Sequence, residues 1–242
     1  MFLDLLNLFQ DMNRSAQPQL VKNIINAMTT TDFQDGDQHD CAEFLDKLLD
    51  QIHEDTVMYS GDTDLIESTF RIELSDNEQG VACSHRSRQR RSVWSLALPL
   101  STHQLEDVNL LLQKIVKKSQ SVPKSCEACR MKHVMLESST FEVLPSVLVL
   151  QLGRFPCKGN KIEKYVGIPN IMQLQIKSGY KVYELRSIVK HKGTSGGGHY
   201  VTATKDPETK QWTEWNDEQV KQITEPEAIT NEAYVVIYQI QS

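Results

Sequence analysis

The stretch SGGGHYVTATK, residues 195–205, places three glycines directly before a histidine and a run typical of a β-strand. Glycine is favoured where the backbone takes unusual dihedral angles or lets another chain approach closely. A catalytic histidine must be reached by substrate and held in one tautomer by a second group. His199 lies at the junction of a glycine-rich loop and a strand, so the stretch predicts a reactive histidine, or else a surface hairpin whose histidine has no role.

The segment QWTEWND, residues 211–217, supplies candidate partners for His199. Asn216 follows His199 by 216 − 199 = 17 residues, a separation that suits two neighbouring antiparallel strands joined by the turn KDPETK. Asn216 or Asp217 could then accept a hydrogen bond from the imidazole. A histidine oriented by asparagine is the arrangement of papain-like cysteine proteases.

The remaining pattern changes from helical to β character along the chain. Apolar residues recur at helical spacing in FLDLLNLFQDM, in QLVKNIINAM and in the segment that begins at Cys41, while residues 56–65 are polar and predict a loop. PSVLVLQL predicts a buried strand, and YKVYELRSIV, HYVTATK, QWTEWN and AYVVIYQI predict further strands. Helices followed by a sheet indicate an α+β architecture.

Composition restricts the class of protein. The chain has 242 residues, 39% apolar and 24% charged residues, and a net charge of −6, which disfavours nucleic acid or a membrane surface as partner. It contains no apolar run of the roughly 18 residues that a transmembrane helix needs. Its five cysteines indicate reduced thiols. We therefore expect an intracellular protein of the cytoplasm, the nucleus or both.

Five segments occur in an order that resembles the ubiquitin-specific protease family of cysteine deubiquitinases: QHDCAEFLDKLLDQIHED, CEACRMKHVMLESSTFEVLPSVLVLQLGRF, GTSGGGHYVTATK, WTEWNDEQV and EAYVVIYQ. The resemblance spans residues 1–240 and implies one catalytic domain with a papain-like core and a thumb–palm–fingers fold. It implies a truncated helical thumb over 1–65, fingers over 66–140 and a β-rich palm over 141–240. The activity implied is hydrolysis of the isopeptide bond after the last glycine of ubiquitin, through a thioester.

The same resemblance implies roles for individual residues. His199 would be the general base, Asn216 its orienting partner and Asp217 an auxiliary polar residue. Residues implied to contact ubiquitin are Gln38, Asp40, Glu43, Gly197, Gly198 and Tyr200. For Asp40 and Glu43 the alternative is a capping box, D-x-x-E before an apolar run, although an acidic pair also suits the arginines of ubiquitin's tail.

The family's nucleophilic cysteine lies in an N-terminal motif resembling GNTCYMNS, which this sequence does not contain. We therefore expect the 242-residue chain to be inactive as it stands, and the alternative function is an inactive ubiquitin-binding or scaffold protein. Cys41 at a helix start is a candidate substitute, since a helix dipole lowers the pKa of a thiol. The carboxylates of Asp40 and Glu43 oppose a thiolate there, so we expect Cys41 to be a packing residue.

Cys126 and Cys129 form a C-x-x-C pair, a spacing that binds zinc when a second pair completes the site. Upstream, Cys83 is followed by His85 and by Arg86, with arginine where a fourth cysteine would stand. Cys83, Cys126 and Cys129 are therefore candidate ligands of a structural zinc site that we expect to have decayed, with free cysteines at a hairpin turn as the alternative, and we expect no required cofactor. The basic run over residues 85–91 predicts a solvated loop of the fingers rather than a nuclear-localisation or nucleic-acid patch. A zinc ribbon acting on nucleic acid is disfavoured by the acidic net charge.

Overall fold

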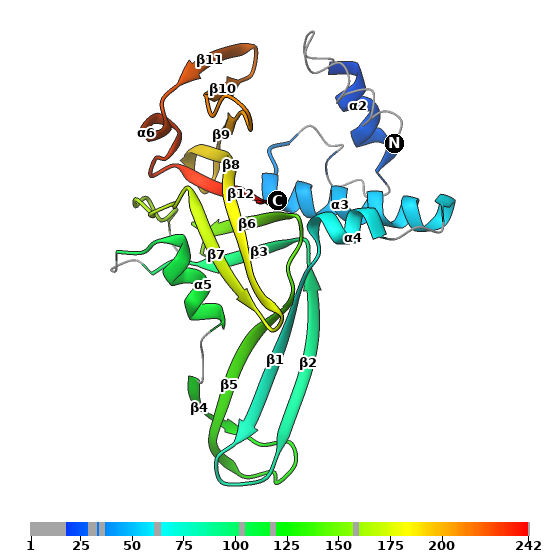
Figure 1. Ribbon diagram of the computed structural model, residues 1–242, viewed down its shortest axis with the longest axis vertical. Helices are drawn as coiled ribbons and strands as arrows, with labels where there is room; N and C mark the ends of the chain where they lie inside the picture. Colours follow the sequence, from blue (N-terminus) through cyan, green and yellow to red (C-terminus); the bar gives the residue numbers. More distant parts are fainter. Residues whose placement is uncertain are drawn as a thin grey trace.

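The computed structural model describes residues 18–28, 33, 37–60, 64–101, 105–116, 120–156 and 160–241. Within these ranges the chain forms two β-sheets and five helices, so the predicted α+β class is confirmed. A four-stranded sheet projects away from an eight-stranded sheet, and helices α3 and α4 lie together on one side of the latter (Figure 1). Among these residues no helix combines the length and the apolar character needed to cross a bilayer.

The helices are α2 (Pro18–Ala27), α3 (Cys41–Ser60), α4 (Asp64–Phe70), α5 (Val108–Val116) and α6 (Glu225–Ala228). The helix predicted over FLDLLNLFQDM lies outside the described residues. The predicted loop over 56–65 is wrong for most of its length, because α3 continues to Ser60 and α4 begins at Asp64. Polar residues do not end a helix by themselves, and no glycine or proline interrupts the sequence between Cys41 and Ser60.

The eight-stranded sheet contains the predicted C-terminal strands. They are β3 (Ser95–Pro99), β6 (Val147–Gly153), β7 (Ile171–Ile176), β8 (Gly179–Thr194), β9 (Gly197–Lys205), β10 (Trp212–Asn216), β11 (Gln219–Ile223) and β12 (Ala233–Ile240). The strand order is β11-β10-β9-β8-β12-β6-β3, and β7 pairs with β8 beside this path. Leu148, Leu150 and Leu152 of β6 are completely buried, as the continuous apolar run predicted.

The four-stranded sheet has the order β2-β1-β5-β4 and is built from β1 (Ile72–Gly80), β2 (Arg86–Val93), β4 (Gln120–Ser125) and β5 (Lys132–Val143). The basic run is therefore mostly the edge strand β2 and not the predicted loop. Acidic side chains nearby offset the repulsion among the arginines of β2. Arg88 lies 2.7 Å from a Glu142 carboxylate oxygen, and Arg91 lies 2.8 Å from an Asp76 carboxylate oxygen.

The segment between the two sheets contributes to both of them. Strand β3 pairs in parallel with β6 of the larger sheet, and α5 buries Val108, Leu111 and Leu112 against the same core. Residues 66–140, the predicted fingers, thus include elements that belong structurally to the eight-stranded sheet. The candidate catalytic groups lie at one end of that sheet: His199 near the start of β9, Asn216 at the end of β10 and Asp217 in the turn that follows.

Candidate active site and metal cluster

His199 and Asn216 meet on adjacent antiparallel strands. β9 pairs with β10, which brings the two side chains together across 17 residues of sequence, and His199 Nε2 lies 2.6 Å from Asn216 Oδ1. A carboxamide oxygen can only accept a hydrogen bond, so Nε2 carries the proton. This tautomer leaves Nδ1 of His199 with a free lone pair, as a general base requires.

Asp217 stands in the turn between β10 and β11 with a φ of 51°. Aspartate tolerates this left-handed conformation better than most residues. Its carboxylate lies 3.6 Å from His199 Nε2 and its side chain is 76% exposed. Asn216 therefore makes the short contact to the imidazole, and Asp217 contributes a solvated negative charge beside it.

A cleft of about 690 Å³ opens beside this pair. Of the residues that the sequence singled out, seven line it: Gln38, Asp40, Gly197, Gly198, His199, Tyr200 and Asp217. Glu43 is exposed on α3 and is not among the lining residues. The segment before α3 and the glycine-rich β8–β9 turn thus form two walls of one cleft, although they are about 160 residues apart in sequence.

Gly198 is required by the packing of its own sheet. A Cβ atom there would lie 2.3 Å from the carbonyl oxygen of Lys192 and 2.4 Å from Nε2 of His191, closer than any side-chain carbon can approach. Its N–H donates to Gln38 Oε1 at 3.0 Å, which links the two walls of the cleft. A Cβ atom at Gly196, in contrast, would lie 3.9 Å from the Thr194 hydroxyl oxygen, an ordinary van der Waals distance. At Gly198 the absence of a side chain is therefore required by the close packing of β9 against β8 and His191.

His191 is a cleft residue that sequence reasoning missed. It pairs with Tyr200 across β8 and β9, and its ring lies 4.9 Å from the Tyr200 ring and 5.1 Å from the Phe155 ring. Burial, and next the charge of Lys161, lower the pKa of His191, and its Nδ1 has no hydrogen-bond partner among the described residues. No pattern in the sequence marks His191, because its position opposite Tyr200 follows from the strand register alone.

Asp40 joins α3 to the eight-stranded sheet. One carboxylate oxygen accepts a hydrogen bond from the N–H of Ala42 at 2.7 Å, which caps the helix, and the other accepts one from the Tyr234 hydroxyl. The Glu43 N–H also donates to the first of these oxygens, at 3.3 Å, so the cap on α3 is provided by the Asp40 side chain.

Cys41 does not have the character of a nucleophile. Its N–H lies 3.4 Å from the Tyr200 hydroxyl, and its thiol is half-buried. Burial, and next the Asp40 charge, raise the pKa of Cys41 to about 12. A nucleophilic cysteine needs the opposite shift. Cys41 is also absent from the lining of the cleft.

Four potential metal ligands converge at the far end of the four-stranded sheet. The donor atoms of Cys83, Cys126, Cys129 and His133 all lie within 4.8 Å of one another. Cys83 Sγ is 3.6 Å from Cys126 Sγ and 3.3 Å from His133 Nε2. The prediction of a decayed site rested on Arg86 and overlooked His133, which follows Cys129 at C-x-x-C-x3-H spacing. This cluster can hold a metal ion.

The surroundings of the cluster suit a metal ligand set. His133 Nδ1 lies 3.0 Å from the carbonyl oxygen of Val134, so this bond orients the ring and leaves Nε2 directed at the thiols. Hydrogen bonds from the backbone, first that of Cys129, lower the pKa of Cys126 to about 6. A thiolate is the form that binds metal. His85 is outside the cluster.

Comparison with known proteins gives consistent results. A family model described as ubiquitin carboxyl-terminal hydrolase matches residues 1–238. Ubiquitin carboxyl-terminal hydrolase 48 of Gallus gallus is 29% identical over 202 residues, which cover 78% of this chain and 20% of that protein. Ubiquitin carboxyl-terminal hydrolase 2 of Bos taurus is 26% identical over 192 residues, which cover 73% of this chain and 31% of that protein.

A solved structure agrees with the fold. The SAGA DUB module, containing Ubp8, Sgf11, Sus1 and Sgf73 and bound to monoubiquitin, includes a chain that matches with a TM-score of 0.72 and 26% sequence identity. The match covers 85% of this chain and 49% of that chain. The present chain therefore spans half or less of the length of these relatives.

Proposed function

Because the chain belongs to the ubiquitin carboxyl-terminal hydrolase family, we propose that it supplies the general base, and the residues that orient it, of a thiol-dependent deubiquitinase. In this proposal His199 is the base, Asn216 orients it and Asp217 assists. The bond cleaved is the isopeptide bond after the C-terminal glycine of ubiquitin.

The hydrogen bond between His199 and Asn216 at the edge of the cleft carries this proposal. With Nε2–H held by Asn216, Nδ1 accepts the proton of an attacking cysteine thiol, and the thiolate adds to the scissile carbonyl carbon. The imidazolium then gives that proton to the leaving amine, and a thioester remains. Water, deprotonated by the same nitrogen, hydrolyses the thioester and regenerates the thiol.

The cleft also suits the slender end of ubiquitin. Gly197 and Gly198 present backbone without side chains, while Gln38 and Tyr200 offer hydrogen-bonding groups along the same cleft. Asp40 supplies negative charge for a basic tail, and exposed Glu43 would act outside the cleft. These contacts to ubiquitin belong to the proposal.

We further assign zinc as the metal of the cluster formed by Cys83, Cys126, Cys129 and His133. Three thiols and one imidazole form a Cys3His donor set, which is a structural zinc ligand set with no open position for catalysis. Zinc bound there would stabilise the end of the four-stranded sheet, and His199 chemistry would not involve it.

Nuclear magnetic resonance of the full 242-residue chain tests the role of His199. We expect ubiquitin to shift the imidazole signals of His199, whose 15N pattern reports the Nε2–H tautomer. Asn216→Ala should mix the tautomers while ubiquitin still binds, and Trp212→Phe on the same strand should leave them unchanged. Imidazole chemical shifts of His199 that do not change at saturating ubiquitin would refute the role of His199 as the base in this cleft.

A second candidate function, ubiquitin binding without hydrolysis, is favoured by one observation: no cysteine lines the cleft in the described part of the chain. Ubiquitin carrying a thiol-reactive C-terminal group separates the two functions. We expect residues 1–242 to remain unlabelled, since the raised pKa of Cys41 keeps its thiol protonated. Labelling that disappears in Cys41→Ser would show that Cys41 is the nucleophile.

A further inference from the structure

Strand β7 has an unpaired edge. It pairs with β8 on one side and with no strand on the other in the described part of the chain. Asn170 and Leu185 form a hydrogen-bonded pair, since the N–H of Leu185 donates to the carbonyl of Asn170 at 2.8 Å. Hydrogen-bonded pairs alternate along an antiparallel ladder, so the backbone N–H and C=O groups of Ile171, Gln173 and Gln175 point away from β8.

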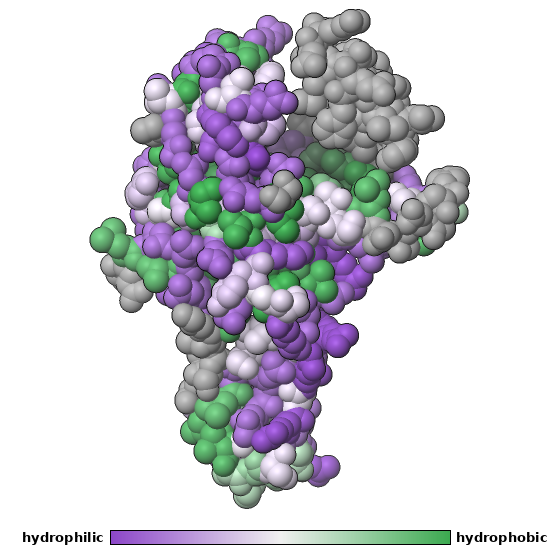
Figure 2. All heavy atoms as spheres, viewed as in Figure 1, coloured by the Kyte–Doolittle hydropathy of each residue, from purple (hydrophilic) through white to green (hydrophobic). Residues whose placement is uncertain are grey.

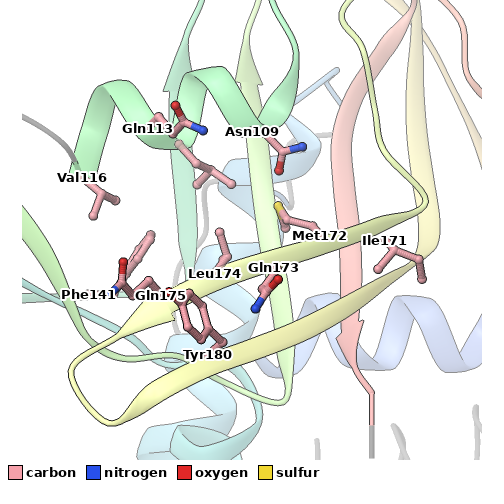
Figure 3. A pocket seen from close by; sticks show the side chains of 11 residues that line it. Asn109, Gln113, Val116, Phe141, Ile171, Met172, Gln173, Leu174, Gln175 and Tyr180 are labelled. Atoms are coloured by element: carbon pink, nitrogen blue, oxygen red, sulfur yellow. The ribbon is translucent and has the colours of Figure 1, made fainter.

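These backbone groups open into a hollow of about 460 Å³ between β7 and α5. Five consecutive residues of β7, 171–175, line the hollow. Side chains of adjacent residues project to opposite faces of a strand, so a cavity touching all five runs along the strand edge. In Figure 3, Asn109, Gln113 and Val116 of α5 stand across the hollow from β7.

The position of α5 beside this edge is fixed by the fold. The N–H of Val108 donates to the carbonyl of Gly167 at 2.9 Å, and Asp107 and Gly167 form a β-bridge at the start of the helix. Val108, Leu111 and Leu112 then anchor the helix in the core. The hollow is therefore preformed, which reduces the entropic cost of binding.

Natural proteins protect exposed strand edges with charged residues, proline or bulges. The other edge strands of this structure follow the rule: β2 carries four arginines, β4 carries Pro123 and Lys124, β11 carries Lys221, and β3 ends at Pro99. Hydrophilic residues cover the β2 side of the smaller sheet in Figure 2. The sequence of β7, IMQLQI, has no charge and no proline. Its edge is open to strand pairing.

The lining of the hollow indicates what kind of chain would pair there. It contains no Asp, Glu, Lys or Arg, but four carboxamides and an apolar floor. Leu112, Phe141 and Leu174 are almost completely buried in that floor, while Tyr180 is 63% exposed at the rim. A neutral wall would leave a charged side chain desolvated and unpaired. The occupant must therefore be extended and uncharged where it lies against β7.

We propose that the β7–α5 groove, residues 109–116 and 171–175, binds an extended uncharged segment of a partner protein as an added β-strand. Main-chain hydrogen bonds to Ile171, Gln173 and Gln175 provide affinity, and alternate apolar side chains enter the hollow. The groove is separate from the His199 cleft, since the two share no lining residue.

The probe is a fluorescein-labelled, end-capped octapeptide that alternates valine with serine or threonine, titrated into the full 242-residue chain. We expect saturable binding and at least a tenfold slowing of amide hydrogen exchange at Gln173 and Gln175. The amides of Met172 and Leu174, already paired with β8, should change less than twofold. The same peptide with N-methyl groups on alternate residues should not bind, because it lacks the donors that pair with β7.

Gln173→Pro removes the one N–H at that position, which faces the groove and not β8, and should weaken binding at least tenfold. Gln173→Thr keeps the N–H and should bind within twofold of the unmodified chain. Gln175→Pro gives an independent variant, and unchanged thermal midpoints show that the variants fold. Equal binding by Gln173→Pro, or no exchange effect in the unmodified chain, would overturn the proposal.

The competing occupant of the groove is a second copy of this chain, and sedimentation velocity tests it by measuring whether the chain self-associates. Self-association that Gln173→Pro abolishes, together with no peptide binding, would assign the β7 edge to a homodimer and contradict the proposal. A monomeric chain that binds the octapeptide would support it.

Discussion

Asp40 performs two structural tasks with its two carboxylate oxygens. One caps α3 through the Ala42 N–H, and the other accepts a hydrogen bond from Tyr234 on β12. The residue also lines the cleft, so its charge is available to a basic ligand. Capping and charge can be separated, since asparagine caps a helix about as well as aspartate does.

Asp40→Asn is expected to weaken ubiquitin binding several-fold at low ionic strength, with a smaller effect at high salt, because the charge is lost. The asparagine oxygen can still cap α3, whereas its NH2 group cannot accept the hydrogen bond from the Tyr234 hydroxyl. Asp40→Ala should in addition lower the free energy of unfolding by about 1 kcal/mol through loss of the cap. Calorimetric titration and urea unfolding measure the two effects. Unchanged affinity of Asp40→Asn at low salt would reduce Asp40 to a capping residue.

Gly198 and Gly196 form a matched pair in one turn. Gly198→Ala should destabilise the fold by about 1–3 kcal/mol, because its methyl group would overlap the Lys192 carbonyl and the His191 ring. Gly196→Ala adds a methyl group at van der Waals distance from the Thr194 hydroxyl, without overlap, and should change stability by less than about 0.5 kcal/mol. Urea unfolding of both variants measures the difference, and equal stabilities would contradict the packing of β8 against β9 at this point.

At the scale of elements, the four-stranded sheet holds its ligands on two hairpins. Cys83 lies beyond the end of β1, Cys126 and Cys129 lie between β4 and β5, and His133 is the second residue of β5. Pairing of Gly80 with Met135 brings the two hairpin ends together. A metal bound by these four residues would link the β1–β2 hairpin to the β4–β5 hairpin.

Loss of His133 should affect this link, whereas loss of His85 should not. His133→Ala is expected to lower zinc affinity by about 100-fold or more, since loss of an outer partner of a ligand alone costs 10–100-fold. His85→Ala is the control, because His85 lies outside the cluster. Competition with a chromophoric chelator measures affinity, and amide exchange in β1 and β5 reports loosening. Equal zinc affinity in His133→Ala would remove this residue from the ligand set.

At the scale of the whole molecule, lysines pair with largely buried carboxylates both within the eight-stranded sheet and beside it. A hydrogen bond from Lys190, on β8, lowers the pKa of Glu214 on β10. Burial opposes ionisation of Glu106, but hydrogen bonds from Lys114 and Lys164 outweigh it and lower the pKa. Each carboxyl therefore binds its proton more weakly in the folded chain than in the unfolded one.

Stability should consequently fall in acid. A depressed folded pKa contributes stability above the unfolded value, near 4.5, and the contribution is lost as pH falls through the folded pKa. Urea midpoints should be constant near neutrality and decrease between about pH 5 and pH 3. Glu214→Gln leaves Lys190 buried without its partner, so it should cost about 3–5 kcal/mol at neutral pH and show a shallower acid dependence. An identical pH profile in Glu214→Gln would contradict this account.

The sequence by itself determined the α+β class, the buried strand within residues 145–152 and the hairpin that brings His199 close to Asn216 or Asp217; the structure showed that Asn216 makes the short contact. These follow from local periodicity and from a hairpin whose length can be counted. The tertiary structure alone decided which residues surround them. His191 against Gly198, His133 among the cysteines and the open edge of β7 all depend on strand register and order. Those depend on contacts between distant segments, because each side chain's neighbours are set by which strands pair and not by residues nearby in the chain.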